Sequence, residues 1–418
     1  MERLPGFRDF YPEPLPNNDL WSAAARQHIF NHWRDTARRY GFLEYDGPPL
    51  EPLELFTLKS GEEILGQLYN FKDKGERDIA LRPEMTPTLA RMVAAHVRHY
   101  KKPLKWFAIP QLFRYERQQK GRLREHFQFN ADILGETDPA SDAELIALLI
   151  DSLRSLGLSE EDFFVRVSSR DAWHEFFATR GGKESDAYAF YQIIDKLERE
   201  NPEQSATKLK SLGFDLDEVR GFIEEARATE GLEAILGNLR SRGLEPFIQI
   251  DYGVIRGLAY YTGVVFEAFD RKGEFRAIAG GGRYDNLIKL VSHGKVDLPA
   301  LGFGMGDVVL LELLRSRGML PDSHACLDLY FLIEDEALRN ASLACMQKLR
   351  EAGWAVDYPL TRTKPDKQFK RALELGARFT ASLTDPIAPQ TVRVKQLRTR
   401  EEATVPLQDL PDWMRAHR

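Results

Sequence analysis

The chain has 418 residues, which is too long for one ordinary hydrophobic core and indicates two or three domains. Its composition, 43% hydrophobic and 29% charged with a net charge of −6, is that of a soluble globular protein and argues against indiscriminate nucleic-acid binding. No apolar run approaches the roughly 20 residues of a membrane span, no secretory signal is visible, and Cys326 and Cys345 form no metal-ligand or disulfide pattern, so we expect a cytoplasmic protein.

The first part of the chain predicts a helix and then a ligand-binding turn. Apolar residues at helical spacing predict a helix over about residues 18–39. In LRPEMTPTLAR, residues 81–91, Glu84 and Thr86 stand two apart before a helix that starts near Pro87. Both side chains could point toward the ammonium group of a ligand. The alternative is a plain helix cap, where the helix dipole favours a carboxylate.

Residues 113–135, FRYERQQKGRLREHFQFNADILG, predict a β-hairpin with a basic loop at about residues 118–124. Side chains alternate across a strand, so a polar row and an apolar row should lie on opposite faces of the second strand. The polar row is Gln128, Asn130 and Asp132, and the apolar row is Phe127, Phe129, Ala131 and Ile133. Arg114 could grip an anionic oxygen, Gln128 and Asp132 could orient a small polar ligand, and the loop cations could meet phosphates. The alternative is a solvated amphipathic hairpin.

The middle of the chain predicts a helix, a strand and a helical insertion. Pro139 and the capping box formed by residues 141–144 predict a helix start, and residues 163–169 read as a strand. From about residue 170 to residue 243 the pattern changes to charged helices with few strands, which indicates an inserted helical domain.

Two glycine-containing stretches follow the insertion. In IRGLAYYTG, Arg256 could stabilise charge that develops on a phosphorus centre, and Tyr261 could hydrogen-bond an imidazole. The alternative is a surface arginine near a tight hairpin. Glycines 280–282, in RAIAGGGRYDNLI, would form a wall without side chains against which a ligand could pack. After residue 321, strands alternate with helices and predict a separate α/β module with a mixed sheet.

Several of these stretches resemble one family. RYERQQKGRLREHFQ is similar to motif 2 of class II aminoacyl-tRNA synthetases in its histidyl form, and YGFLEYDGPPLEPLELF to motif 1. RGLAYY and RAIAGGGRYDNLI resemble the two histidyl-specific motifs, and LGFGMGDVVLLELL occupies the place of motif 3. The resemblance implies an α+β fold: a class II antiparallel-sheet catalytic domain over residues 1–169 and 244–320, a helical insertion domain over 170–243, and a C-terminal α/β anticodon-binding domain over 321–418.

The resemblance also implies an activity and a set of site residues. The reaction would be activation of L-histidine with ATP to histidyl-adenylate and pyrophosphate, then transfer of the histidyl group to the 3′ end of tRNA-His. The partners would include a second copy of the chain, bound through motif 1, and Mg²⁺ carried on the ATP phosphates rather than by a protein site. The catalytic residues would be Arg256 and Arg114. Those binding histidine would be Glu84, Thr86, Gln128, Asp132, Arg256, Tyr260 and Tyr261, and those binding ATP would be Arg114, Glu116, Arg122, His126 and Phe127. Glu116 would help to hold adenine or the metal.

The chain departs from the family pattern at four places, and these keep two alternatives open. Val308 replaces the motif 3 arginine, Ala259 replaces an aspartate, and Asp132 stands where most members carry glutamate. His126-Phe127 reverses the usual order, so either ring could stack on adenine. One alternative is a non-catalytic, histidine-sensing paralogue like the regulatory subunit of ATP phosphoribosyltransferase, which usually lacks the C-terminal module. The other is a pseudo-synthetase that binds RNA.

Overall fold

The computed structural model describes residues 2–12, 22–60, 62–115, 123–197, 200–255, 261–321, 327–385 and 390–417. The chain divides into two compact units, Met1–Pro321 and Asp322–Arg418. Throughout the residues that the structure describes, no helix combines the length and the apolar character that crossing a bilayer requires.

The first unit is built on a nine-stranded sheet that is antiparallel except for its two outermost pairs. In spatial order the strands are β1 (Leu43–Glu44), β5 (Leu104–Ala108), β7 (Glu125–Leu134), β12 (Ala300–Gly306), β11 (Ala279–Arg283), β10 (Thr262–Asp270), β8 (Phe163–Ser169) and β9 (Ile248–Ile250), with β6 (Gln111–Phe113) paired to β7. This order places the strand of the predicted hairpin beside the glycine-rich strands from the other end of the unit. The predicted antiparallel sheet is confirmed.

The hairpin itself is confirmed, because β6 and β7 pair in antiparallel register. The predicted alternation along β7 is also present. Phe129, Ala131 and Ile133 are buried in the main core, while the even-numbered side chains face the other side of the sheet. Residues 116–122, which include most of the predicted basic loop, lie outside the described residues.

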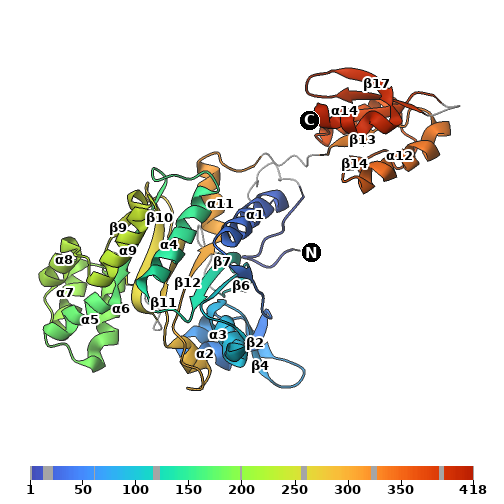
Figure 1. Ribbon diagram of the computed structural model, residues 1–418. Coiled ribbons are helices and arrows are strands. Elements are labelled where there is room, and N and C mark those ends of the chain that lie inside the picture. The colour runs from blue at the N-terminus through green and yellow to red at the C-terminus, as the bar shows by residue number, and fades with distance from the viewer. Residues whose placement is uncertain are drawn as a thin grey trace. The chain divides into compact units, whose positions relative to one another are not determined.

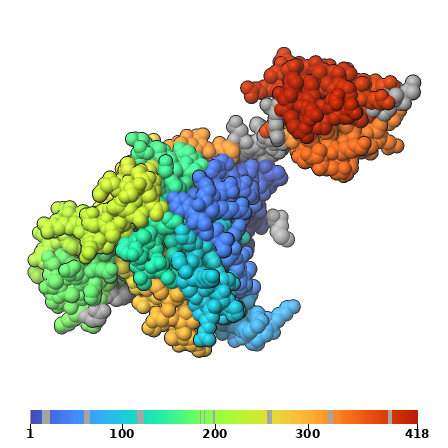
Figure 2. Space-filling model, viewed as in Figure 1, coloured from blue at the N-terminus to red at the C-terminus, as the bar shows by residue number. Residues whose placement is uncertain are grey.

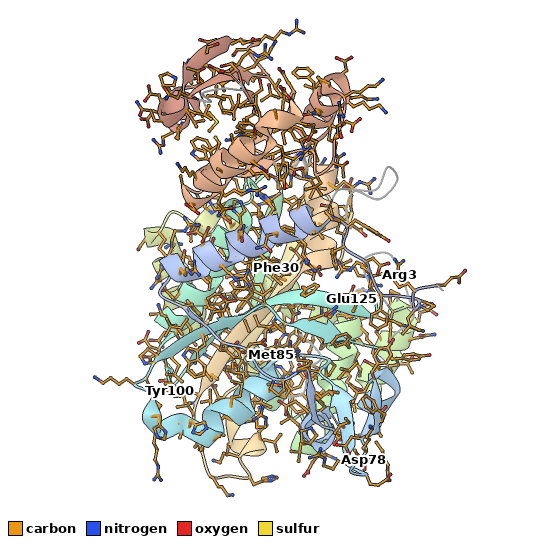
Figure 3. The ribbon with its side chains drawn as sticks, turned by 90° about the vertical axis from the view of Figure 1, so that its right-hand side faces the viewer. Arg3, Phe30, Asp78, Met85, Tyr100 and Glu125 are labelled. Atoms are coloured by element: carbon orange, nitrogen blue, oxygen red, sulfur yellow. The ribbon has the colours of Figure 1, made fainter. Side chains whose placement is uncertain are left out.

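Three helices cover the apolar face of this sheet: α1 (Ala23–Arg39), α4 (Pro139–Arg154) and α11 (Asp307–Ser316) (Figure 1). Trp33 of α1 is fully buried and stacks on Phe129 of β7, with 5.6 Å between ring centroids. In Figure 3, Phe30 lies between α1 and the sheet, whereas Met85 lies on the opposite side. One face of the sheet therefore packs against an apolar layer of helices, and the opposite face carries the polar row of β7.

The start of α4 corrects one prediction. The capping box of residues 141–144 does not form, because Asp138 is the N-cap and its side chain accepts from Ala140 N at 2.8 Å. Pro139 takes the first helical position, where its missing N–H costs nothing. Ser141 Oγ instead donates back to Asp138 O, so it caps nothing. Asp142 becomes free for a contact outside the helix.

The other face of the sheet is covered by α3 (Thr86–His96) and α10 (Leu287–Val291), which share a core with the end of β7. Beside them lie α2 (Glu54–Ser60) and a small sheet of β2 (Leu50–Pro52), β4 (Asp78–Leu81) and β3 (Asn70–Lys72). The helix predicted to start near Pro87 is confirmed, and it begins at Thr86. It brings Glu84 to the polar side of β7.

The predicted helical insertion consists of α5 (Arg170–Thr179), α6 (Ala187–Lys196), α7 (Pro202–Ser211), α8 (Leu216–Glu225) and α9 (Glu230–Ser241). In the space-filling view these helices form one contiguous region of the first unit, coloured green to yellow-green (Figure 2). Trp173 lies fully buried at their aromatic centre and donates from Nε1 to Tyr252 O at 3.0 Å. Their buried residues belong to the same core as the large sheet, so the insertion packs onto that sheet.

The described part of the second unit contains a five-stranded mixed sheet and three α-helices. The strand order is β14 (Val356–Asp357), β13 (Leu329–Phe331), β15 (Phe379–Leu383), β16 (Thr391–Gln396) and β17 (Glu402–Pro406), with the first two pairs parallel and the last two antiparallel. The helices are α12 (Arg339–Glu351), α13 (Pro365–Glu374) and α14 (Leu410–Ala416). The predicted α/β module is confirmed, although α14 was not among its predicted elements.

Candidate functional site

A pocket with a volume of about 80 Å³ lies on the polar face of β7. The structure brings five of the predicted residues to its wall: Glu84, Thr86, Arg114, Gln128 and Tyr261. Among the remaining lining residues, Gly280 belongs to the predicted wall without side chains, and the prediction did not assign the others to a ligand: Asn130, Tyr284, Gly302, Phe303 and Gly304. A volume of this size suits a small polar molecule and is well below that of a drug-sized pocket, about 300 Å³ or more.

The segment after β6 and the segment before α3 fix the basic and acidic groups of the pocket relative to each other. Arg114 follows β6 and donates from Nε to Pro83 O at 3.1 Å, directly before Glu84. Phe113 N donates to Arg82 O at 3.0 Å, so the hairpin and the start of α3 are linked twice. The positive end of the α3 dipole also favours a carboxylate at this point. The pocket therefore places a carboxylate and a guanidinium on neighbouring segments.

Glycines in β12 make room for the polar row of β7. Gly302 pairs with Asp132 and Gly304 pairs with Asn130 in the antiparallel ladder. A Cβ atom on Gly302 would overlap the Asp132 carboxylate, and one on Gly304 would lie 2.6 Å from Gln128 Cδ. Glycine is therefore required for close approach at these positions, and the side-chain-free wall extends from β11, where it was predicted, into β12.

We expect Gly302→Ala to weaken binding of histidine, the ligand that the resemblance of the sequence implies, because the added methyl group must displace the Asp132 carboxylate. The dissociation constant for histidine, measured by calorimetry, should rise more than about tenfold. Gly306→Ala is the control, since a Cβ atom there has nothing within 4 Å. Wild-type affinity in the Gly302 variant would show that Asp132 does not shape the pocket.

Asp132 lies behind the pocket wall and is hydrogen-bonded to Tyr284. Only 2% of Asp132 is exposed, and Tyr284 Oη donates to its Oδ1 at 2.6 Å. Tyr284 lines the pocket, whereas Asp132 is not among the lining residues. Asp132 Oδ2 is buried without a hydrogen-bond partner among the described residues, as is Asn130 Oδ1 in the pocket wall. An unpaired acceptor is costly to bury, so Asn130 Oδ1, which lies in the pocket wall, is available to a donor from a ligand.

Burial raises the pKa of Asp132 from its ordinary value of 3.8 to about 7, and the Tyr284 hydrogen bond opposes this rise. The folded protein therefore holds a proton on Asp132 that the unfolded chain releases above pH 3.8. Between pH 3.8 and 7 the folded state binds more protons at this group, so the stability that the group contributes falls as pH rises.

We therefore expect the stability difference between wild type and Asp132→Asn to change with pH. The free energy of unfolding of the wild type should fall by up to about 4 kcal/mol relative to the variant between about pH 4 and pH 7, since each tenfold step of proton affinity is worth about 1.4 kcal/mol. Chemical denaturation at several pH values measures this. The exposed substitution Glu161→Gln should show no such trend, and parallel curves for wild type and Asp132→Asn would contradict the raised pKa.

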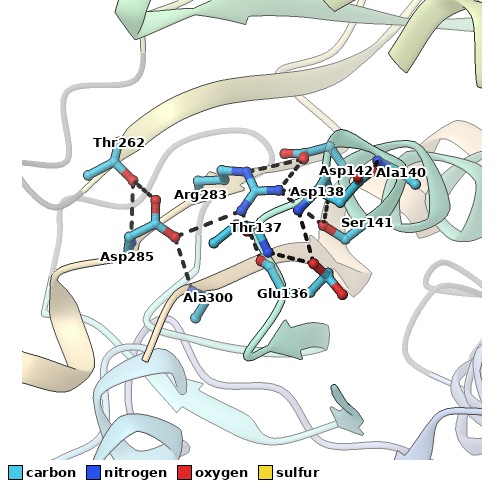
Figure 4. A network of polar contacts seen from close by, with 10 residues as sticks. All are labelled: Glu136, Thr137, Asp138, Ala140, Ser141, Asp142, Thr262, Arg283, Asp285 and Ala300. Carbon is cyan, nitrogen blue, oxygen red and sulfur yellow. Dashed lines mark hydrogen bonds and ion pairs between the residues drawn. The ribbon is translucent and has the colours of Figure 1, made fainter. Parts of the chain in front are cut away.

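A buried arginine holds the residues behind the pocket in place (Figure 4). Arg283, at the end of β11, donates from Nε to Asp142 Oδ2 at 3.1 Å and from Nη1 to Glu136 O at 3.1 Å. It is 8% exposed. Burial raises the pKa of Asp142 to about 6, although the neighbouring guanidinium opposes the rise. The network ties the strand that precedes Tyr284 to the turn between β7 and α4.

The structure separates the two rings that were predicted to contact adenine. Phe127 lies on the α1 side of β7, where its ring centroid is 5.2 Å from that of Phe30 and its N–H donates to Asp307 Oδ1 at 3.0 Å. His126 is the neighbouring residue on the same strand, so it faces the side that carries Gln128. Of the two rings, that of His126 is the one on the same face as the pocket.

Asp307, the residue before Val308, pairs with a residue near the N-terminus. Asp307 is fully buried and forms an ion pair with Arg8 Nη1 at 2.9 Å, and Arg8 Nε also contacts Glu125 Oε1 at 2.7 Å. Burial raises the pKa of Asp307, against the effect of the guanidinium. No sequence signal marks Arg8, because ion pairs between distant segments leave no local pattern. Val308 is half-buried in the next position.

Four predicted site residues lie outside the described residues: Arg256, Tyr260, Glu116 and Arg122. Their assignment to the site stays a prediction. In the ranges that the structure describes, no group of three His, Cys, Asp or Glu side chains is arranged to hold a metal ion.

Comparison with known proteins identifies both units. A model of the family described as histidyl-tRNA synthetase matches residues 15–307, and one described as anticodon binding domain matches residues 329–417. The histidine--tRNA ligase of Opitutus terrae is 45% identical, and the match covers 99% of this chain and 98% of the relative. The chloroplastic/mitochondrial histidine--tRNA ligase of Arabidopsis thaliana is 38% identical over 97% of this chain and 85% of its own length.

A solved structure shows the same fold. The crystal structure of histidyl-tRNA synthetase from Nostoc sp. PCC 7120 superposes with a TM-score of 0.81 at 22% identity and covers 100% of this chain and 99% of that one. At this identity the likeness concerns the fold alone. The mixed arrangement of an antiparallel sheet with a C-terminal α/β module is thus common to both.

Proposed function

We infer the work of the site from the premise that this chain belongs to the histidyl-tRNA synthetase family and is a histidine--tRNA ligase, a class II aminoacyl-tRNA synthetase. The enzyme activates L-histidine with ATP and transfers it to tRNA. What the residues of this chain contribute to each step is our proposal, and it rests on one observation. Five predicted residues from four separate segments line a single small pocket.

The pocket is proposed to bind both ends of histidine, the α-ammonium group and the imidazole ring. Glu84 accepts from the α-ammonium group together with the Thr86 hydroxyl, and Gln128 completes the polar wall on that side. Tyr261 and Tyr284 meet the imidazole, with Asp132 fixing the Tyr284 hydroxyl from behind. A competitor without ring nitrogens leaves these buried groups unpaired, which costs about 1–3 kcal/mol per group.

Activation needs alignment and charge compensation, because the histidine carboxylate is already a nucleophile. It attacks the α-phosphorus of ATP, the bond from that phosphorus to the bridging oxygen breaks, and pyrophosphate leaves. Arg114 lies in the pocket wall with a rigid fork of donors and is proposed to hold the carboxylate and the α-phosphate together. Arg256 is proposed for the same centre and Arg122 for the outer phosphates, both from the sequence motifs.

The nucleotide is proposed to extend from Arg114 along β7 toward the first residues of that strand. His126 is the ring on the correct face to stack on adenine, and Phe127 is assigned to packing under α1. Tyr260 is proposed to contact histidine, and Glu116 to contact adenine or magnesium. Magnesium bound to ATP would neutralise phosphate charge, with water completing its shell.

The remaining partners follow from the two units. The second unit matches an anticodon-binding domain and is proposed to contact the anticodon of tRNA-His, and we expect an enzyme of translation to work in the cytoplasm. A homodimer is proposed through the edge of the large sheet, where β1 pairs with β5 and with no other strand of the described residues. Leu43 on that strand is 68% exposed and Tyr100 is 44% exposed, which suits burial against a second copy. A monomer in sedimentation equilibrium would contradict the dimer.

The histidine-sensing regulatory role is not favoured. That type of subunit usually lacks the C-terminal module, whereas this chain carries it and matches histidine--tRNA ligases over nearly its full length.

The test is exchange of labelled pyrophosphate into ATP in the presence of each of the amino acids in turn. We expect exchange with histidine alone, and aminoacylation of tRNA-His but not of other tRNAs. Arg256→Ala should abolish or severely reduce the exchange. Exchange that depends on another amino acid, or none with histidine, would contradict the proposed function.

A further inference from the structure

Arg170 connects the helical insertion to the histidine pocket. It is the first residue of α5, directly after the end of β8, and its Nη1 donates to the backbone oxygen of Tyr261 at 2.5 Å. Tyr261 lines the pocket. A hydrogen bond from a cation to a carbonyl is stronger than one between neutral groups, so this contact restrains the backbone at Tyr261.

The surroundings of Arg170 make this contact unusual for an arginine. Burial lowers the pKa of its guanidinium, which means that the charge is partly withdrawn from water. No carboxylate within ion-pair distance of Arg170 is found among the described residues, and its Nε is buried there without a hydrogen-bond partner. The guanidinium instead lies over the ring of Tyr191 on α6, 5.0 Å from the centroid. Arg170 is half-buried, and the field of Asp195 offsets only part of the effect of burial on its pKa, so the contacts with Tyr261 and Tyr191 are the close contacts of the guanidinium.

The Tyr261 side chain is confined from the other side. A Cβ atom on Gly282 would lie 3.0 Å from Tyr261 Cδ1, so the ring packs against bare backbone of β11. Thr262, the next residue, donates from Oγ1 to Asp285 Oδ2 at 2.8 Å. The tyrosine is thus held by β11 along its ring and by Arg170 at its carbonyl. Arg170 belongs to the helical insertion, whereas Gly282 and Asp285 lie outside the insertion.

We propose that Arg170 is a positioning residue for histidine recognition, which sets the place of Tyr261 in the pocket according to the packing of α5 and α6. Arg170 does not touch the amino acid. It acts through the Tyr261 backbone, so its loss should weaken the affinity for histidine and the preference for an imidazole side chain. This inference rests on the proposed function, because it names Tyr261 as a histidine contact.

The test compares Arg170→Met, which keeps the apolar stem, with Arg170→Lys, which keeps the charge and a donor. In Arg170→Met we expect the dissociation constant for histidine, measured by calorimetry without ATP, to rise about tenfold, and the KM for histidine in pyrophosphate exchange to rise similarly. The kcat and the KM for ATP should change less than about threefold. Arg170→Lys should recover most of the affinity.

Arg180→Met is the matched control, because Arg180 ends the same helix and also lies over an aromatic ring, that of Phe176 at 3.8 Å. It should leave histidine affinity unchanged. Unchanged affinity in Arg170→Met overturns the proposal, and so does an equal rise in the KM for ATP with a lowered unfolding midpoint, which would mark a merely structural role. Failure of the proposed function is separate, since it would show as no histidine-dependent exchange in the wild type.

Discussion

Replacement of Arg114 by alanine is expected to lower the kcat of histidine-dependent pyrophosphate exchange by about 10²–10³-fold, the usual effect of removing one donor that faces developing charge. Arg114 lies in the pocket wall, and its Nε is directed to Pro83 O, immediately before Glu84. The guanidinium is therefore oriented before any ligand binds. Because the guanidinium does not have to reorient, it stabilises the charge of the transition state more strongly than water would.

Three measurements separate this role from a structural one. Arg114→Lys should recover only part of the rate, because an ammonium group keeps the charge but lacks the rigid fork that meets two oxygens. The exposed substitution Arg98→Ala should leave kcat unchanged. The unfolding midpoint of Arg114→Ala should stay near that of the wild type. A variant that exchanges pyrophosphate at the normal rate would remove Arg114 from the chemistry.

Arg283→Met is expected to have the largest effect on stability, about 3–5 kcal/mol in the free energy of unfolding of the first unit, because it leaves Asp142 buried without its partner. Asp142 is 1% exposed, and burial already raises its pKa to about 6. Without the guanidinium that pKa should rise further. The folded variant then binds a proton more tightly than the unfolded chain, so its deficit should be larger at about pH 8 than at about pH 5.

Denaturant unfolding of wild type and variants at these two pH values measures the effect. Adding Asp142→Leu to Arg283→Met should restore part of the stability, since no buried carboxylate remains at that position. Arg38→Met removes an exposed arginine that is 3.8 Å from Asp35 and should change the free energy by less than about 1 kcal/mol. A single Arg283 variant as stable as the Arg38 variant would show that the network in Figure 4 contributes little.

The site was predictable where its residues follow a local pattern. Alternation along residues 127–133 is enough to separate the polar row from the apolar row, and the turn before Thr86 marks Glu84 as a candidate. These signals are local because a strand turns every second side chain to the same face. Asn130 belonged to that polar row yet was left out of the predicted ligand set.

Contacts between distant segments were not predictable in this way. The pairing of Asp142 with Arg283, far along the chain, left no local signal, and the capping box predicted at residues 141–144 was wrong because Asp138 is the N-cap. The roles of His126 and Phe127 were open, because either order satisfies the pattern until the position of α1 is known.

By itself, the sequence of this protein determined its two-part organisation and the polar face of the strand that carries the site, since both follow from local patterns, and its motifs carried the resemblance to its family. Tertiary structure alone decided that Tyr284 stands between Asp132 and the pocket, that glycines of β12 clear the space above β7, and that Arg8 pairs with Asp307. The physical reason is that the burial and pairing of a side chain depend on which segments meet. The spacing of residues along one segment does not indicate which segment packs against it.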